Sequence, residues 1–221
     1  MAEKLTRRGL VTSAVAAGMA GFALAGRVGE ALAELVATPR QTTGPFYPVE
    51  LPLDSDNDLV RVAGRPQQAA GNVFHLFGRV LDPDGRALSG AEVQIWQCDA
   101  RGYYHHPRDR GGQADPNFQG FGTAMTAEDG AYRFRTIRPV AYPGRTPHIH
   151  FAVLGSEFDA LVTQMYLRGE PGNERDGPFR GISDPAERES VLVAAEPAPE
   201  VEAGALAGTF DLVIGKSLFK T

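Results

Sequence analysis

Two histidines, His148 and His150, stand two positions apart in an apolar run near the middle of the chain. Alternate residues of a β-strand point to the same face, so both imidazoles would project together. Ile149 and Phe151 would then point to the opposite face, where a hydrophobic core would cover them. The pattern therefore predicts a strand that offers two nitrogen ligands to one metal ion.

Tyrosines near the two histidines narrow the chemistry. Tyr142 lies shortly before His148, and Tyr103 and Tyr104 form a pair further upstream. Free tyrosine has a pKa of about 10, so binding as tyrosinate near neutral pH requires a strong Lewis acid such as Fe(III). A His-x-His pair alone is more often cross-strand packing or a zinc site, and imidazole also suits copper. The tyrosines favour a ferric ion, and a zinc or copper hydrolase using His148 and His150 is an alternative.

Short apolar runs separated by turn residues must position these side chains. Strands are expected at residues 74–81, 91–97, 131–137, 148–154, 161–167, 190–195 and 209–214. Residues 98–125 lack strong periodicity and are expected to form a long functional loop. A polar loop is expected over 168–181, and one helical turn at 184–188. Many short strands at regular spacing predict an all-β fold, a β-sandwich of mostly antiparallel strands with long active-site loops.

The N-terminal region has the features of a removable signal peptide over residues 1–33. Thr6-Arg7-Arg8-Gly9-Leu10-Val11 has the twin-arginine form, and Ala31-Leu32-Ala33 fits a small-x-small cleavage site. The motif predicts export, most simply to the periplasm. This pathway moves folded proteins, so a cofactor can be loaded before export, and the motif favours a protein that carries one. The alternative is an ordinary secretory signal that carries two arginines. Residues 34–221 are then one domain, whose residues 34–72 form an N-terminal arm along the surface.

Composition excludes several classes of protein. The net charge is −5, and no basic cluster follows the signal, which argues against nucleic-acid binding. The apolar stretch of the signal is too short and too rich in Gly and Ala to be a stable membrane anchor. Cys98 is the only cysteine, so no intrachain disulfide can form.

Ordered motifs along the chain carry a family resemblance. They are Thr38-Pro39-x-Gln41-Thr42-x-Gly44-Pro45-Phe46, Ile95-Trp96-Gln97, Gly102-Tyr103-Tyr104-His105-His106, Asp115-Pro116-Asn117-Phe118-x-Gly120, Thr136-Ile137-Arg138-Pro139, Tyr142-Pro143, Pro147-His148-Ile149-His150-Phe151 and Thr163-Gln164-x-Tyr166. In this order they resemble the intradiol ring-cleavage dioxygenases, most closely the protocatechuate 3,4-dioxygenase branch. The resemblance covers roughly residues 38 to 185.

The resemblance implies an Fe(III)-dependent enzyme, with one iron per subunit, that uses O2 to cleave a catechol to a cis,cis-muconate-type diacid. The family's iron ligands fall on Tyr104, Tyr142, His148 and His150. Tyr142 is also expected to leave the metal and act as a base. The resemblance further implies that Arg145 stabilises negative charge on the ring and that Gln164 positions that arginine or the substrate. The family's substrate-lining segment falls on Thr42, Gly44 and Pro45.

Two departures from the family pattern concern the substrate. The loop from Tyr142 to His148 is shorter than in typical members, and Gly144 stands where a tryptophan often follows Tyr-Pro. A more open pocket and a substrate larger than protocatechuate are expected. No clear basic residue is assigned to a substrate carboxylate.

The resemblance leaves assembly open, although homo-oligomers are common in the family. The alternative function is a non-catalytic transthyretin-like or carbohydrate-binding β-sandwich module.

Overall fold

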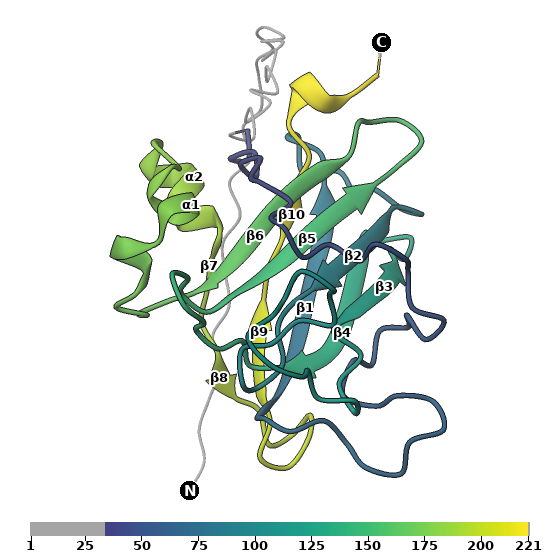
Figure 1. The fold of residues 1–221 in the computed structure, drawn as a ribbon. Coiled ribbons are helices and arrows are strands. Elements are labelled where there is room, and N and C mark those ends of the chain that lie inside the picture. The colour runs from purple at the N-terminus through teal and green to yellow at the C-terminus, as the bar shows by residue number, and fades with distance from the viewer. Residues whose placement is uncertain (1–33, 221) are drawn as a thin grey trace, which may run out of the picture. The chain divides into compact units, whose positions relative to one another are not determined.

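The computed structural model describes residues 34–220, which form strands, two short α-helices and two 3₁₀ helices (Figure 1). The predicted signal peptide lies outside the described residues. The strands are β1 (Val73–Leu81), β2 (Glu92–Trp96), β3 (Phe121–Met125), β4 (Ala131–Ile137), β5 (His148–Leu154), β6 (Leu161–Leu167), β7 (Leu192–Val193), β8 (Glu196–Pro197), β9 (Leu206–Thr209) and β10 (Leu212–Val213). The helices are η1 (Asn173–Arg175), α1 (Gly177–Arg180), α2 (Pro185–Ser190) and η2 (Lys216–Leu218).

The strands form two sheets, as expected for a β-sandwich. In the first sheet, β1 pairs with β4 along one edge and with β9 and β10 along the other, and β8 pairs with β9. The second sheet has the order β3-β2-β5-β6-β7. The longer pairings are antiparallel, whereas β1–β9, β1–β10 and β6–β7 are short parallel pairings. Both sheets are therefore mixed.

Alternating side chains produce the core between the two sheets. Phe74 and Leu76 of β1, Phe134 of β4, and Ile149 and Phe151 of β5 belong to one buried apolar cluster. The predicted inward face of β5 is thus confirmed. Its other face carries the histidines, which are also buried because loops cover this side of the second sheet.

Several expected elements differ from those observed. The segment 98–125 ends in β3, whose sequence Phe-Gly-Thr-Ala-Met has a weak strand pattern. The loop expected over 168–181 contains η1 and α1, and the strand expected at 190–195 shortens to β7. The run at 209–214 divides between the end of β9 and β10. Figure 1 shows α1 and α2 beside the β7 edge of the second sheet.

The segment before β1 lies along both sheets. Backbone hydrogen bonds join Thr38 to Val213 of β10, and Gln41 to Val162 of β6. Further along, Thr123 of β3 donates to the carbonyl of Ser55. The segment therefore brings residues 41–47 over the histidine face of the second sheet.

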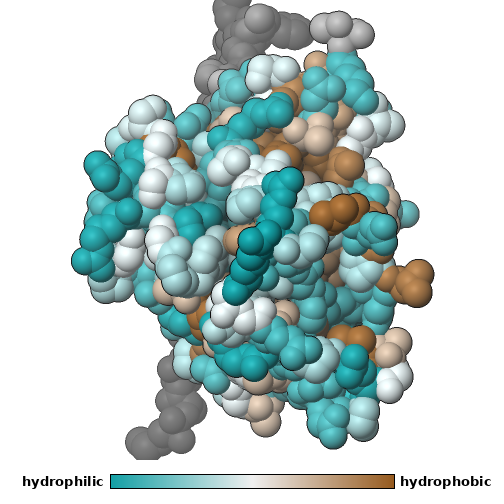
Figure 2. Space-filling view, viewed as in Figure 1, coloured by the Kyte–Doolittle hydropathy of each residue, from teal (hydrophilic) through white to brown (hydrophobic). Residues whose placement is uncertain are grey.

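The surface shown in Figure 2 is mostly hydrophilic, with apolar residues scattered among polar ones. Val49, Leu51 and Leu53, in the segment before β1, are among the exposed apolar side chains. Within residues 34–220, no helix has the length and apolar character needed to cross a membrane.

Candidate active site

The strand register places a row of polar and aromatic side chains on the outer face of the second sheet. His150 of β5 lies opposite Trp96 of β2 on one side and Gln164 of β6 on the other. The indole of Trp96 stacks flat on the His150 imidazole, with ring centroids 4.9 Å apart and planes 5° apart. The rings of His148 and His150 have centroids 4.9 Å apart. The two imidazoles are therefore brought together and held by packing.

Hydrogen bonding fixes the tautomer of His148. Its Nδ1 lies 2.6 Å from the carbonyl oxygen of Thr146. Because a carbonyl can only accept, Nδ1 carries the proton and Nε2 keeps its lone pair. Burial, with the nearby Arg145, lowers the pKa of His148 to about 4. Burial and the neighbouring His148 also lower the pKa of His150. Both rings are thus neutral near pH 7, which is the form that binds a metal.

Two tyrosines approach the histidines from separate loops. Tyr104 follows β2, and its backbone N–H donates to Asp109 Oδ2 at 2.7 Å. Its ring lies 5.7 Å from that of Tyr142 at an angle of 90°. The Tyr142 ring lies 5.5 Å from that of His148. The four predicted ligands therefore converge.

Tyr103 takes no part in this convergence. Its ring packs against Gly112, where an added Cβ would lie 2.6 Å from the Tyr103 Cζ. The guanidinium of Arg101 lies 5.8 Å from the ring centroid. The geometry thus favours Tyr104 over its neighbour as the ligand.

The buried donor atoms fit a metal ion. Tyr104 Oη, His148 Nε2 and His150 Nδ1 are buried and have no hydrogen-bond partner among the described residues. An unpaired buried polar atom costs about 1–3 kcal/mol, so such atoms at one site call for a ligand. Between residues 34 and 220, no group of three or more His, Cys, Asp or Glu side chains could hold a metal. A metal at this site would therefore need the tyrosines.

The chemistry of the tyrosines restricts the metal. Burial, followed by the neighbouring Tyr142, raises the pKa of Tyr104 well above its ordinary value. Burial also raises the pKa of Tyr142, although Arg145 opposes the shift. Only a strongly acidic cation would displace both protons near neutral pH. The donor set thus fits Fe(III) better than Zn(II).

Arg145 lies beside Tyr142 with its guanidinium held on two sides. Its Nε donates to Asp176 Oδ2 at 2.8 Å, and its Nη2 donates to Gln164 Oε1 at 2.5 Å. Its Nη1 lies 3.5 Å from Tyr142 Oη. Burial lowers the pKa of Arg145, but Asp176 and Tyr142 outweigh it and the pKa is raised. A fixed positive charge therefore points at the proposed ligand Tyr142.

Gln164 connects this arginine to the predicted substrate-lining segment. Its Nε2 donates to the carbonyl oxygen of Thr42 at 3.1 Å, while its Oε1 accepts from Arg145. Thr42 Oγ1 in turn accepts from the N–H of Gly44 at 3.1 Å. Gly44 has φ +71°, and an added Cβ would lie 3.1 Å from His150 Cε1. Thr42, Gly44 and the exposed Pro45 thus lie in the segment that approaches His150.

Several residues that contact the site were not predicted to do so. Asp176, at the N-terminus of α1, holds Arg145, and nothing in its sequence surroundings indicated a partner so far along the chain. Phe46 stacks on Tyr104 with ring centroids 4.6 Å apart. Tyr166 donates its hydroxyl to Gln41 Oε1 at 2.6 Å. Trp96 belongs to the motif Ile95-Trp96-Gln97, but its stacking on His150 depends on strand register.

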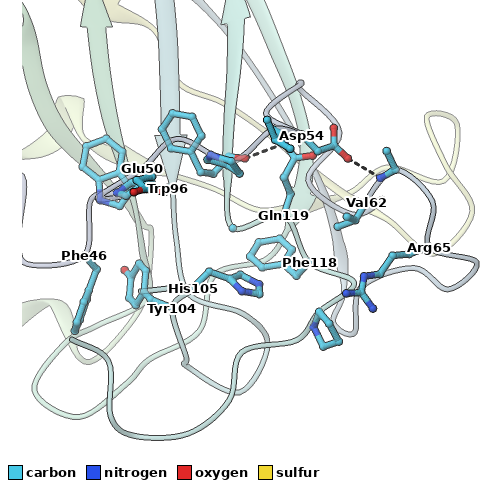
Figure 3. A pocket seen from close by; sticks show the side chains of 17 residues that line it. Phe46, Glu50, Asp54, Val62, Arg65, Trp96, Tyr104, His105, Phe118 and Gln119 are labelled. Atoms are coloured by element: carbon cyan, nitrogen blue, oxygen red, sulfur yellow. Dashed lines mark hydrogen bonds between the residues drawn. The ribbon is translucent and has the colours of Figure 1, made fainter. Parts of the chain in front are cut away.

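Two hollows are lined in part by residues of the site. A cavity of about 590 Å³ lies on the side of the N-terminal segment, and its lining includes Phe46, Trp96 and Tyr104 but not the other proposed ligands (Figure 3). A second hollow, of about 440 Å³, is lined by residues that include Gly144 and Arg145. Because the larger cavity is lined by only one of the four proposed ligands, donor chemistry rather than size identifies the centre. An added Cβ at Gly144 would meet nothing within 4 Å, so space is open beside the short loop.

Known proteins resemble the chain over most of its length. A family model described as "Dioxygenase" matches residues 42–214. The protocatechuate 3,4-dioxygenase beta chain of Burkholderia cepacia is 37% identical over 184 residues, which cover 79% of this chain and 78% of that protein. Catechol 1,2-dioxygenase 1 of Acinetobacter lwoffii is 30% identical over 61% of this chain and 47% of that protein. The chain thus spans about half the length of that relative.

Solved structures agree with the sequence relatives. The dioxygenase domain of a dioxygenase carbohydrate-binding protein fusion from Streptomyces sp. SirexAA-E is 29% identical, with a TM-score of 0.62. The match covers 81% of this chain and 99% of that one. Catechol 1,2-dioxygenase from Acinetobacter sp. ADP1 is 29% identical, with a TM-score of 0.63, over 81% of this chain and 63% of that one. Since the family model covers far more than half of the sequence, the chain belongs to the intradiol dioxygenase family of enzymes.

Proposed function

We propose that the chain cleaves a catechol-type ring between its two hydroxyl-bearing carbons, with O2 and one Fe(III) per subunit, to a cis,cis-muconate-type diacid. The diacid contains all atoms of the catechol and both atoms of O2. The observation that carries the proposal is the convergence of Tyr104, Tyr142, His148 and His150, three of which present buried atoms without a hydrogen-bond partner. Membership of the intradiol dioxygenase family supports the reaction class.

Tyr104, Tyr142, His148 and His150 would hold the ion. When bound, Fe(III) supplies a Lewis acid and a template that brings the two catechol oxygens into one site. Two phenolates and two neutral imidazoles suit the ferric state, since anionic oxygen donors stabilise the higher charge. The Thr146 carbonyl keeps Nε2 of His148 free for the ion by binding Nδ1. Trp96 keeps the His150 ring in one orientation by stacking on it.

Tyr142 differs from Tyr104 in a way that suits a base. Tyr104 is only 5% exposed, whereas Tyr142 is partly exposed and lies next to Arg145. A substrate hydroxyl that approaches the site would therefore meet Tyr142 Oη first, and that oxygen can take its proton. The guanidinium 3.5 Å away would stabilise the negative charge left on the substrate. Gln164 keeps the guanidinium in this position through its Oε1.

The open space at Gly144 is relevant to the size of the substrate. Nothing lies within 4 Å of a Cβ built on this residue, and Gly144 and Arg145 both line the neighbouring hollow of about 440 Å³. We infer that the substrate is a catechol larger than protocatechuate. Relatives named for protocatechuate, catechol and hydroxyquinol indicate that the family accepts differently substituted rings.

Oxygen uptake by the iron-loaded protein tests this function. A panel of catechols that increase in substituent size is offered, and the products are identified by mass spectrometry. The proposal predicts diacids that are heavier than the substrate by two oxygen atoms, with larger catechols turned over faster than protocatechuate. Absence of oxygen uptake with every catechol, or cleavage outside the two hydroxyl-bearing carbons, would contradict it.

We also propose export through the twin-arginine pathway, on the evidence of Arg7 and Arg8 in the motif at the N-terminus. Replacement of both by lysine should leave the full-length protein in the cytoplasm, as measured by cell fractionation. Periplasmic accumulation of the double variant would contradict this route.

A further inference from the structure

We propose that Asp176 is a positioning residue that fixes the plane of the Arg145 guanidinium and so aims Nη1 at the Tyr142 hydroxyl. This inference rests on the role given above to Arg145. The two residues are far apart in sequence and meet because the segment of η1 and α1 packs against the turn before β5.

The carboxylate of Asp176 is fully buried, with 0% side-chain exposure, and both of its oxygens are used. Oδ2 accepts from Arg145 Nε at 2.8 Å and from the backbone N–H of Thr146 at 3.1 Å. Oδ1 accepts from the backbone N–H of Phe179 at 3.1 Å, which caps α1. The carboxylate is therefore fixed by two backbone groups, and Arg145 binds to a rigid acceptor.

Two anchors determine the position of a planar guanidinium. Asp176 holds Nε, and Gln164 holds Nη2 at 2.5 Å. The remaining nitrogen, Nη1, lies 3.5 Å from Tyr142 Oη. Because the group is rigid and planar, the two bonds together fix the direction of the third nitrogen. With Gln164 alone, the guanidinium could turn about a single contact, and Nη1 would no longer be held toward Tyr142 Oη.

Asp176 is less important for the histidine ligands than for Arg145. The Thr146 carbonyl accepts from His148 Nδ1, so the turn before β5 must stay in place. This turn has a second support, since Thr146 Oγ1 donates to Asn173 Oδ1 at 2.8 Å. Loss of the Asp176 charge should therefore disturb the arginine while the histidines keep their geometry. A variant that disturbs Arg145 but leaves the histidines in place would show that Asp176 positions the arginine and has no general structural role.

Asp176→Asn in the iron-loaded protein is the first test. We expect kcat to fall about 10- to 100-fold, the usual effect of removing a group that orients an active-site side chain, while bound iron and its visible colour remain. Asp184→Asn is the matched control, because Asp184 Oδ1 likewise caps a helix, α2, through Ala186 N and Glu187 N. The control should keep the wild-type kcat. An unchanged kcat in Asp176→Asn would overturn the proposal.

A double-mutant cycle separates the two residues' effects. If Asp176 acts through Arg145, then Asp176→Asn should lower kcat little further in an Arg145→Ala background. Equal fold-losses of kcat in the wild-type and Arg145→Ala backgrounds would overturn the proposal, because Asp176 would then act by another route.

A readout independent of turnover is the ¹⁵N–¹H resonance of Arg145 Nε. The protein is loaded with diamagnetic Ga(III) in place of Fe(III), and exchange of this proton with water is measured. Slow exchange is expected in the wild type and fast exchange in Asp176→Asn, with Asp184→Asn like the wild type. Equal exchange in wild type and Asp176→Asn would overturn the positioning role. If the exchange behaves as expected but the wild type cleaves no catechol, only the proposed function fails.

Discussion

At the scale of single residues, the site depends on side chains that the protein leaves without partners. His148 Nε2, His150 Nδ1 and Tyr104 Oη are buried without hydrogen bonds among the described residues. A fold tolerates such groups when a ligand binds them, and a ferric ion would do so here.

The shared face of the two imidazoles could be predicted from strand alternation, because alternation depends on sequence spacing alone. The Asp176–Arg145 contact could not, since it needs the packing of two loops.

Arg145→Ala should separate catalysis from metal binding. The guanidinium contacts Tyr142, Gln164 and Asp176 and is not among the proposed ligands. We expect iron content and colour to persist, while kcat falls about 10²- to 10³-fold, the usual effect of losing one charge-stabilising donor. The matched control is Arg168→Ala, which removes a surface pair with Glu189 and should leave kcat unchanged. Loss of iron from the Arg145 variant would contradict its assigned role.

The buried histidines should make the iron-free protein sensitive to acid. Burial lowers the pKa of folded His148 to about 4, whereas the ordinary value is 6.5. The unfolded chain therefore binds more protons between these values, and the free energy of unfolding falls as the pH drops from about 6.5 to about 4. The loss is on the order of 3 kcal/mol for this residue.

Urea unfolding of the iron-free protein across this range measures the effect. His148→Gln should show a smaller loss of stability than the wild type, with the rest attributable to His150, whose pKa burial also lowers. Wild-type stability that stays constant from pH 6.5 to 4 would contradict the account.

At the scale of elements, strands with clear alternation were predicted well. The observed bounds of β4, β5 and β6 equal those expected, because each alternates or continues in apolar residues that face the core. β3 was missed because Gly122 and Ala124 weaken its pattern, and its stability comes from pairing with β2. α1 was missed because four residues give no helical period, and its cap comes from the side chain of Asp176.

Gly44→Ala tests how the N-terminal segment meets β5, the strand that carries the two proposed histidine ligands. The φ of +71° makes any side chain strained, and the new Cβ would lie 3.1 Å from His150 Cε1. Gly64→Ala is the matched control, with φ +76° and no atom within 4 Å of its Cβ. Both variants should lose about 1–2 kcal/mol of unfolding free energy from strain. Only Gly44→Ala should also weaken iron binding, measured by competition with a chelator. Equal iron affinity in both would contradict a close approach of this segment to His150.

At the scale of the whole molecule, the sandwich core packs against one face of the second sheet. Loops assemble the candidate site on the other face. The fold class followed from many short strands at regular spacing, and the family motifs supplied the proposed ligands. The family motifs already favoured Tyr104 over Tyr103 as the proposed ligand. The structure adds the loop conformation, in which Tyr103 packs on Gly112 and the Tyr104 ring lies against that of Tyr142. Loop conformation depends on contacts such as Asp109 with Tyr104 N, which no local sequence pattern indicates.

The visible absorption spectrum during titration with Fe(III) reports directly on whether tyrosinates bind the ion. Wild-type protein should bind one equivalent and turn burgundy-red through tyrosinate-to-iron charge transfer. Tyr103→Phe should give the same band, whereas Tyr104→Phe should weaken or shift it and abolish ring cleavage. A wild-type protein that stays colourless after iron loading would contradict the account, and so would an unchanged band in Tyr104→Phe.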